Sequence, residues 1–175
     1  LMFPILQLNL EELVYRPPGT EDIRLLTLFV DSQDYPENHG SWLIRTYSSL
    51  AKLRSLDPPP LDFRVRAISL GPPALIEDYP SFEDLQETVE DELWDNFSEQ
   101  YPPARGVKLG GWPSLVQSEI YWAPHNEHPA EPRYVLQVDS LEGAGWQWGH
   151  DGCAYLGRGT AKGRQNDWVF EWQCL

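Results

Sequence analysis

The sequence predicts an α+β fold that is mainly antiparallel β, with two related sheet-forming halves and one amphipathic acidic helix. Three observations support this prediction. Short apolar and aromatic runs recur between turn-forming residues, one stretch shows helical periodicity, and a weak internal repeat relates the beginning of the chain to its last third. The 175 residues, 41% of them hydrophobic, suffice for one well-packed domain spanning residues 1–175.

Seven segments predict β-strands, because each is rich in Val, Ile, Leu or aromatic residues and is bounded by Pro, Gly or Asp. They are residues 5–10, 24–31, 42–47, 62–70, 133–139, 153–158 and 168–174. The last two predict an antiparallel hairpin. Its register would make Cys153 and Cys174 near neighbours, and we expect both to be reduced.

Residues 81–97 predict the helix. Ser81 and Asp84 form a capping box, and apolar residues then recur at three- and four-residue spacing. The opposite face is strongly negative and is a candidate surface for binding a partner. It carries Glu83, Glu87, Glu90, Asp91 and Asp95.

The internal repeat consists of FPILQLNL at residues 3–10 and RYVLQVDS at residues 133–140. Each is followed about 20 residues later by an apolar strand segment, LLTLFVD or GCAYLGR. This similarity predicts two related halves. A Gly-Gly-Trp-Pro turn precedes the second copy, and its counterpart would fall before residue 1, so we expect the opening segment of the first half to be absent.

Charge narrows the possible partners. The formal net charge is −14, and residues 77–99 hold ten acidic residues with no Lys or Arg. Such a field repels nucleic acid and anionic lipid and favours a basic protein partner, although a charge run is more often only a solvated surface. Two cysteines and the lack of a signal peptide predict a cytoplasmic protein, and no apolar run is long enough to span a membrane.

The stretch KLGGWPSLVQ, residues 108–117, has two interpretations. A phosphate-binding loop would need a Gly spacing followed by Lys and Ser or Thr, which is missing, and Pro113 removes a backbone N–H that such a loop would use. A structural turn fits better. Its glycines would allow unusual φ angles and close backbone approach, and Trp112 would reach the surface.

Catalytic and metal sites have weak support. His125-Asn126-Glu127-His128 could offer metal ligands but lies in a proline-flanked loop, and His150 with Cys153 lies on opposite faces of a strand. We predict no metal, no cofactor and no catalytic residue. Arg158, Lys162 and Arg164 would form a small basic patch at an ordinary hairpin tip.

Several motifs in order resemble the YwqG-like bacterial family. They are KLGGWP with Gln117, then LQVDS at residues 136–140, then WGHDG at residues 148–152, and an aromatic strand through Trp172. The family usually has Asp directly after Trp-Gly, whereas this chain has His150. The resemblance implies a domain of largely unknown function, similar to ribosomal-protein chaperones of the programmed-cell-death type and to domains in toxin-neutralising contexts.

The charge and the resemblance together predict a non-catalytic intracellular protein that binds a basic partner. An immunity-type protein that neutralises a bacterial toxin is the first hypothesis. A chaperone for a basic ribosomal protein is the second, and a hydrolase using His150 or the His125 loop is the third. Besides the acidic helix face, Trp112 and Trp148 are candidate contact residues, since Trp is enriched at binding hot spots.

Overall fold

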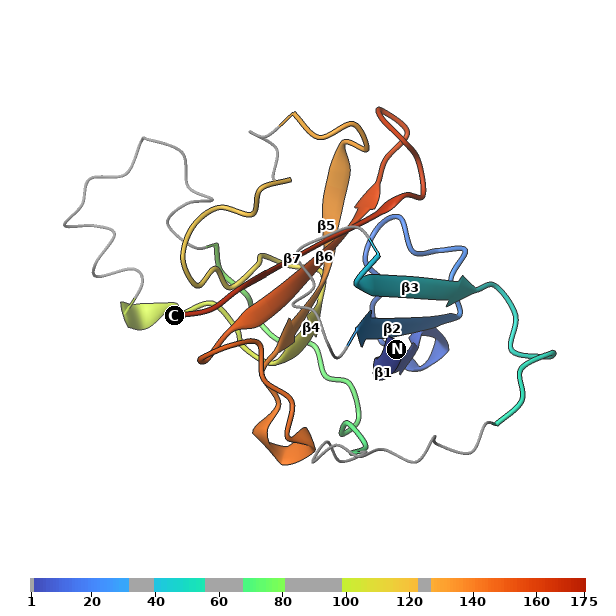
Figure 1. The fold of residues 1–175 in the computed structure, drawn as a ribbon, viewed down its shortest axis with the longest axis horizontal. Coiled ribbons are helices and arrows are strands. Elements are labelled where there is room, and N and C mark those ends of the chain that lie inside the picture. Colours follow the sequence, from blue (N-terminus) through green and yellow to red (C-terminus); the bar gives the residue numbers. More distant parts are fainter. Residues whose placement is uncertain (1, 32–39, 56–67, 81–98, 123–126) are drawn as a thin grey trace.

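The computed structural model describes residues 2–31, 40–55, 68–80, 99–122 and 127–175. Their strands form two antiparallel sheets (Figure 1). The first has the order β1-β2-β3 and the second the order β4-β5-β6-β7. The strands are β1 (Met2–Asn9), β2 (Leu25–Asp31), β3 (Trp42–Tyr47), β4 (Val107–Leu109), β5 (Pro132–Asp139), β6 (Cys153–Gly159) and β7 (Trp168–Gln173).

The fold is mainly β, so the predicted α+β class is wrong. The regular secondary structure of the described residues is nearly all antiparallel sheet and includes no helix of seven or more residues. The short helical turns η1 (Leu10–Glu12) and η3 (Glu142–Ala144) are 3-10 turns. The predicted helix at residues 81–97 lies outside the described residues. In the described part no helical layer is needed, because each sheet buries the inner face of the other.

The core between the sheets draws its side chains from both halves. Alternate residues of β2 point inward, and they meet residues from β5, β6 and β7. The ring of Trp42 on β3 stacks on Phe170 of β7 with centroids 5.5 Å apart. The largest fully buried members of this core include Leu10, Ile23, Leu26, Leu28, Val30, Val135, Leu136, Val138 and Leu156.

The other face of the second sheet is covered by irregular chain from residues 114–122 and 127–130, which runs beside the strands of that sheet in Figure 1. Its side chains form a second, smaller cluster with β6 and β7. The cluster consists of Ile120, Trp122, Ala130, Cys153, Tyr155 and Val169. The second sheet is therefore buried on both faces.

The two halves share an irregularity that supports the internal repeat. The β1–β2 register shifts between Pro4 and Leu6, and the β5–β6 register shifts between Tyr134 and Leu136. These are equivalent positions when FPILQLNL and RYVLQVDS are aligned. In each half a 3-10 turn then leads out of the bulged strand. A β-bulge is a specific backbone feature, so its recurrence indicates that the halves repeat in structure as well as in sequence.

The predicted hairpin is confirmed. In the β6–β7 pair Cys153 lies opposite Gln173, which places Cys174 one residue along, and both cysteines are free. Most of the other predicted strands are present, with boundaries that differ from the prediction by at most three residues. The exception is the segment 62–70, of which residues 62–67 lie outside the described part and 68–70 form no strand.

Among the described residues, no helix is both long and apolar enough to cross a membrane.

Candidate functional site

The Gly-Gly turn after β4 is a structural turn, as the sequence predicted. Gly110 and Gly111 have φ angles of 70° and 71°, in the left-handed region that favours glycine. A Cβ atom on Gly111 would lie 2.2 Å from Oδ2 of Asp78, which is closer than atoms can approach. The turn thus requires glycine both for its φ angle and for the carboxylate packed against it.

Asp78 anchors this turn. Its Oδ2 accepts a hydrogen bond from the backbone N–H of Trp112 at 2.8 Å, and its Oδ1 accepts one from the N–H of Ala104 at 3.1 Å. The ammonium group of Lys108 donates to Oδ1 at 3.0 Å, and both side chains are at most 10% exposed. Burial lowers the pKa of Lys108, an effect that its bond to Asp78 opposes. Asp78 therefore holds both the backbone of the turn, at Trp112, and the strand before it, at Lys108.

The chain after the turn is held to the sheet through Ser114. Its N–H donates to Oε1 of Gln137 at 2.7 Å, and its carbonyl accepts from the Tyr155 hydroxyl at 2.7 Å. Its own hydroxyl donates to the carbonyl of Ala104 at 2.6 Å. Ser114 is 1% exposed, so despite lying 3.5 Å from the Lys108 amine it presents no nucleophile to solvent.

Two side chains of β7 bind the backbone of the chain after Ser114. Oε1 of Gln173 accepts from the N–H groups of Val116 at 3.1 Å and Gln117 at 3.2 Å. Glu171 accepts from the N–H of Tyr121 at 2.5 Å. Burial raises the pKa of Glu171, against the effect of these hydrogen bonds. Backbone groups that irregular chain leaves unpaired are thereby satisfied by side chains of the sheet.

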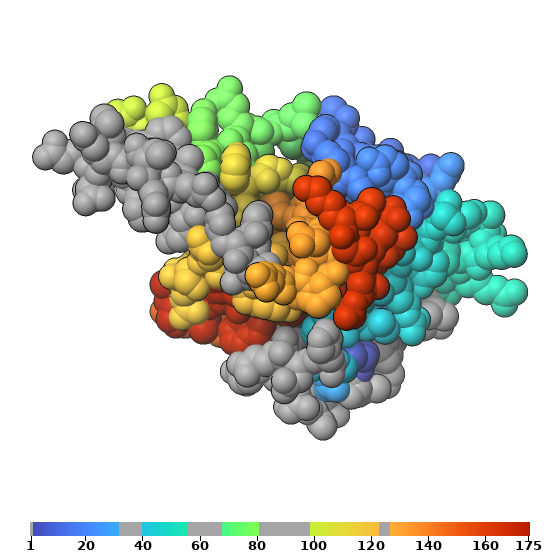
Figure 2. All heavy atoms as spheres, turned by 90° about the horizontal axis from the view of Figure 1, so that it is seen from above, coloured from blue at the N-terminus to red at the C-terminus, as the bar shows by residue number. Residues whose placement is uncertain are grey.

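Exposed apolar side chains lie on the chain segments that contact this turn. The ring of Tyr15 lies against Gly110, and the rings of Tyr79 and Tyr101 are 4.7 Å apart between centroids. Figure 2 shows residues 68–80, in green, lying between residues 10–24, in blue, and those near 100, in yellow-green. We call this surface the apolar patch. It consists of Val14, Tyr15, Leu75, Ile76, Tyr101 and Trp112, which are 39–71% exposed.

Exposed carboxylates lie next to the apolar patch in the chain. Glu11 and Glu12 precede Val14, Glu77 follows Ile76, and Glu99 precedes Tyr101. None of these side chains is buried. Glu11 is also paired with Arg24. We call these four carboxylates the acidic rim, and apolar residues accompanied by polar and charged ones are usual in protein-binding surfaces.

The predicted contact residues fall in three different places. Trp112 is 42% exposed and belongs to the apolar patch. Trp148 is 2% exposed and packs edge-to-face on Trp146 with centroids 5.0 Å apart, so it belongs to the core and offers no surface to a partner. The acidic residues Glu83, Glu87, Glu90, Asp91 and Asp95 lie outside the described residues.

The residues suggested for catalysis are not brought together. His150 is exposed, whereas Cys153 is fully buried and burial raises the pKa of its thiol far above the ordinary value. His125 lies outside the described part, and Nδ1 of His128 accepts the N–H of Ala130. No group of three potential metal ligands occurs among the residues that the structure describes.

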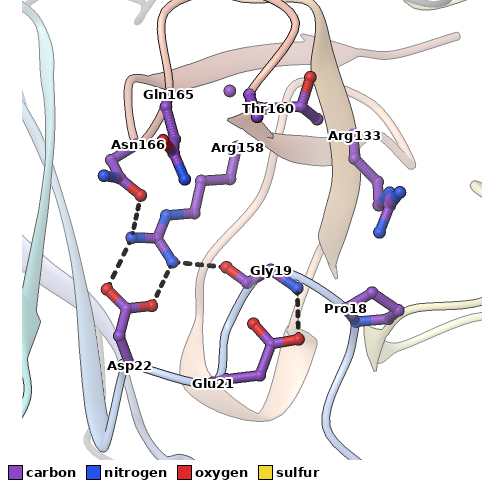
Figure 3. Close-up of a pocket in the computed structure, with 11 residues that line it drawn as sticks. Pro18, Gly19, Glu21, Asp22, Arg133, Arg158, Thr160, Gln165 and Asn166 are labelled. Carbon is purple, nitrogen blue, oxygen red and sulfur yellow. Dashed lines mark hydrogen bonds and ion pairs between the residues drawn. The ribbon is translucent and has the colours of Figure 1, made fainter.

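The predicted basic patch is also changed by the structure, because Arg158 is buried. Its guanidinium donates to both carboxylate oxygens of Asp22, at 2.6 and 2.9 Å, and to the carbonyl of Gly19 and the side chain of Asn166 (Figure 3). A pocket of about 430 Å³ lies beside this contact, with Arg133 on its other side. Since Asp22 belongs to the first half and Arg158 to the second, this ion pair links the halves.

Comparison with curated proteins found no match. A family model described as a domain of unknown function, DUF1963, matches residues 2–174, which is nearly the whole chain. The motif residues of the KLGGWPS turn and of the LQVDS strand are those that hold the second sheet and its covering chain together. The chain belongs to the DUF1963 family, a domain of unknown function.

Proposed function

We propose that this protein is a non-catalytic binding domain that holds a basic partner protein on its apolar patch, as an immunity-type protein that neutralises a bacterial toxin. The observation that carries the proposal is the exposed apolar patch with its acidic rim, mounted on the turn that Asp78 fixes. The fold and the family are established without it, so the experiment below addresses function alone.

The apolar patch is unusual for a surface with no binding role. Leu75 is 68% exposed, Ile76 is 58% exposed and Trp112 is 42% exposed. Single exposed apolar residues are common, but contiguous apolar patches with a polar rim are typical of interaction sites. Tyr and Trp are also the side chains that most often dominate binding energy. Because backbone hydrogen bonds hold the turn, Trp112 would be presented without a large ordering cost.

Charge indicates the kind of partner. The net charge of −14 and the rim residues Glu11, Glu12 and Glu77 would attract a positively charged protein and speed its association. Toxins that cleave nucleic acids carry a basic face for their substrate. The resemblance to the YwqG-like family, some of whose relatives occur in toxin-neutralising contexts, supports the same partner class.

A chaperone for a basic ribosomal protein is the second candidate, favoured by the same charge and by the resemblance to chaperones of the programmed-cell-death type. The acidic residues between Glu83 and Asp95 would strengthen the negative electrostatic potential of the protein for either partner. Their contribution stays a prediction. A hydrolase has less support, since the thiol of Cys153, the nucleophile considered together with His150, is 0% exposed.

The proposal is tested by isolating the partner from the native host and measuring association with the purified pair. Trp112→Ala should speed dissociation at least tenfold, because it removes an aromatic anchor while leaving the backbone bond to Asp78. The triple change Glu11→Lys, Glu12→Lys and Glu77→Lys should slow association at least tenfold at low salt, and salt should weaken the wild-type complex similarly.

The matched control reverses three exposed carboxylates elsewhere, with Glu131→Lys, Glu142→Lys and Asp167→Lys, and should leave association nearly unchanged. Recovery of a ribosomal protein in place of a toxin would favour the chaperone. Unchanged rates for both the Trp112 variant and the rim variant would show that the apolar patch is not the contact surface.

A further inference from the structure

The pocket beside the ion pair of Asp22 and Arg158 lies between the two halves of the chain. One wall comes from residues 18–22 of the first half, and the other from β5 and the hairpin loop at residues 159–166 (Figure 3). Its volume of about 430 Å³ is within the range of sites for small molecules. The pocket shares no residue with the apolar patch, so a ligand bound here is independent of the function proposed above.

Two arginines occupy neighbouring positions in the second-half wall. Arg133 of β5 lies directly opposite Arg158 of β6 in the strand register. Residues opposite each other on antiparallel strands point to the same face, and like charges there are destabilising. Arg158 is neutralised by both carboxylate oxygens of Asp22. Arg133 is exposed and has no hydrogen bond or ion pair with the residues that the structure describes.

The internal repeat indicates that the sheet itself does not require this arginine pair. When FPILQLNL is aligned with RYVLQVDS, Phe3 is the equivalent of Arg133. Phe3 lies opposite Val30, as Arg133 lies opposite Arg158. The first half thus forms the same strand pair with two apolar residues where the second half has two cations. We therefore attribute the arginine pair to the pocket and not to the repeated sheet.

The first-half wall carries a carboxylate, Glu21. Its Oε1 accepts the N–H of Gly19 at 3.0 Å, and Figure 3 shows both residues on the side of the pocket that faces Arg133. This hydrogen bond lowers the pKa of Glu21, so the carboxylate is ionised at neutral pH. Glu21 is exposed, and its Oε2 has no partner among the described residues. The pocket therefore contains one cation and one anion that the described chain leaves unpaired.

Both walls are held in place by the chain itself. In the hairpin loop the N–H of Gly159 donates to the carbonyl of Asp167 at 2.7 Å. A Cβ atom on Gly159 would lie 2.0 Å from the carbonyl oxygen of Arg164, so the loop packs closely on the strand. In the first half Thr20 is fully buried and its hydroxyl donates to the carbonyl of Pro17 at 2.7 Å. A ligand would meet a pocket that is already formed, which keeps the ordering cost of binding small.

We propose that this pocket binds a small zwitterion, a molecule with a carboxylate at one end and an ammonium group at the other. The carboxylate accepts hydrogen bonds from the guanidinium of Arg133, and the ammonium group donates to Oε2 of Glu21. A phosphate would suit Arg133, but the charge of Glu21 on the facing wall would repel it. Free amino acids and short peptides are the molecules of this class.

Probes with different spacing between the two charges test the proposal on the full chain. They are glycine, γ-aminobutyrate, ε-aminocaproate and triglycine. Calorimetric titration should show saturable one-to-one binding of at least one probe, and amide NMR shifts should centre on Gly19 and Gly159. Acetate, methylammonium and inorganic phosphate should each bind at least tenfold more weakly than the best zwitterion. A preference for triglycine would assign the pocket to peptides, and a preference for glycine would assign it to free amino acids.

Two variants test the two contacts separately. Arg133→Gln should weaken the best zwitterion at least tenfold, whereas Arg164→Gln, an exposed arginine of the same hairpin loop that does not line the pocket, should not. Glu21→Gln keeps an acceptor for the N–H of Gly19 but removes the charge. It should weaken the zwitterion at least tenfold without weakening acetate, and Glu131→Gln is its control. All four side chains are exposed, so these variants should fold like the wild type.

Lack of saturable binding by every probe would overturn the proposal, as would acetate or phosphate binding as tightly as the best zwitterion. Unchanged affinity in Arg133→Gln or in Glu21→Gln would overturn it too. NMR shifts centred on Trp112 would place the ligand on the apolar patch and not in this pocket, with the same consequence. No partner protein takes part in these measurements, so their failure would leave the function proposed above untouched.

Discussion

At the scale of single residues, the Gly-Gly turn depends on contacts that few other residues allow. Gly111 combines a left-handed φ angle with the closest approach of a carboxylate, and Asp78 in turn serves the N–H groups of Trp112 and Ala104. Lys108 is buried beside the same carboxylate. A change at one of these residues therefore disturbs the partners of all of them.

Gly111→Ala should lower the free energy of unfolding by about 2–4 kcal/mol, because it adds left-handed strain and pushes Asp78 away from its partners. Chemical denaturation measures this loss. Gly143→Ala is the control: its added Cβ meets no atom within 4 Å, so its effect should stay within about 0.5 kcal/mol. Equal losses in the two variants would contradict the role of the turn.

At the scale of elements, the irregular chain after β4 is ordered by the side chains of β5 and β7. Gln137 and Gln173 act as acceptors for its backbone N–H groups, in place of a further strand. Gln173 also donates to the carbonyl of Ser118 at 2.9 Å. The glutamines explain how a proline-containing segment can cover a sheet without ladder pairing.

Gln173→Ala should cost about 2–4 kcal/mol, because it leaves the N–H groups of Val116 and Gln117 without their acceptor. Hydrogen exchange should accelerate at residues 114–121 more than in β5 or β6, since the segment opens locally. Gln147→Ala, at an exposed position, should change neither quantity appreciably. Uniform acceleration across the second sheet would argue against a local clamp.

At the scale of the whole molecule, the halves are joined by the apolar core and by the ion pair of Asp22 with Arg158. The Arg158 side chain is 8% exposed and that of Asp22 is 66% exposed, so the buried partner depends on the exposed one. Arg158 also lies 5.8 Å from the ring centroid of Trp168. Loss of Asp22 would leave a buried cation with fewer acceptors.

Asp22→Asn should lower the Tm at pH 7 by a few degrees, where about 1 kcal/mol corresponds to roughly 2–4 °C for a domain of this size. The hydrogen bonds from Arg158 lower the pKa of Asp22 below its ordinary value of 3.8. The stabilisation is therefore present above pH 3.8 and is lost as the pH falls through the lowered pKa. The Tm difference between wild type and variant should shrink over that range.

The control for this prediction is Asp167→Asn, an exposed carboxylate whose removal should change the Tm little at any pH. A difference between wild type and Asp22→Asn that stays constant down to the lowest pH at which the protein folds would show that the carboxylate charge is not what links the halves.

Local patterns in the sequence predicted most of the strands but missed β4, the short strand at the edge of the second sheet. Apolar runs bounded by turn residues located most of the strands and the Cys153 hairpin. β4 was missed because three residues, Val107–Leu109, carry too little periodicity to recognise. The α+β class was wrong because the prediction assigned a core role to a helix, whereas the two sheets bury each other.

The candidate site was predicted only in part. The exposure of Trp112 was predicted, because a tryptophan after two glycines indicates a turn that exposes it, and its role in binding stays a prediction. Tyr15 and Asp78 were missed, since neither lies in a motif and both reach the turn through tertiary contacts across long chain separations. Trp148 was placed on the surface although it is buried, because composition does not reveal which side of a sheet a loop residue faces.

The sequence by itself determined the strand segments, the repeat of two halves, the glycine turn and the strong negative charge, because each is written in neighbouring residues. Only the tertiary structure decided that Asp78 meets Lys108, 30 residues away, and that Asp22 meets Arg158, 136 residues away. Such pairs depend on how the sheets stack, which no local pattern encodes. The same stacking leaves the apolar patch exposed, and the surface proposed for binding follows from it.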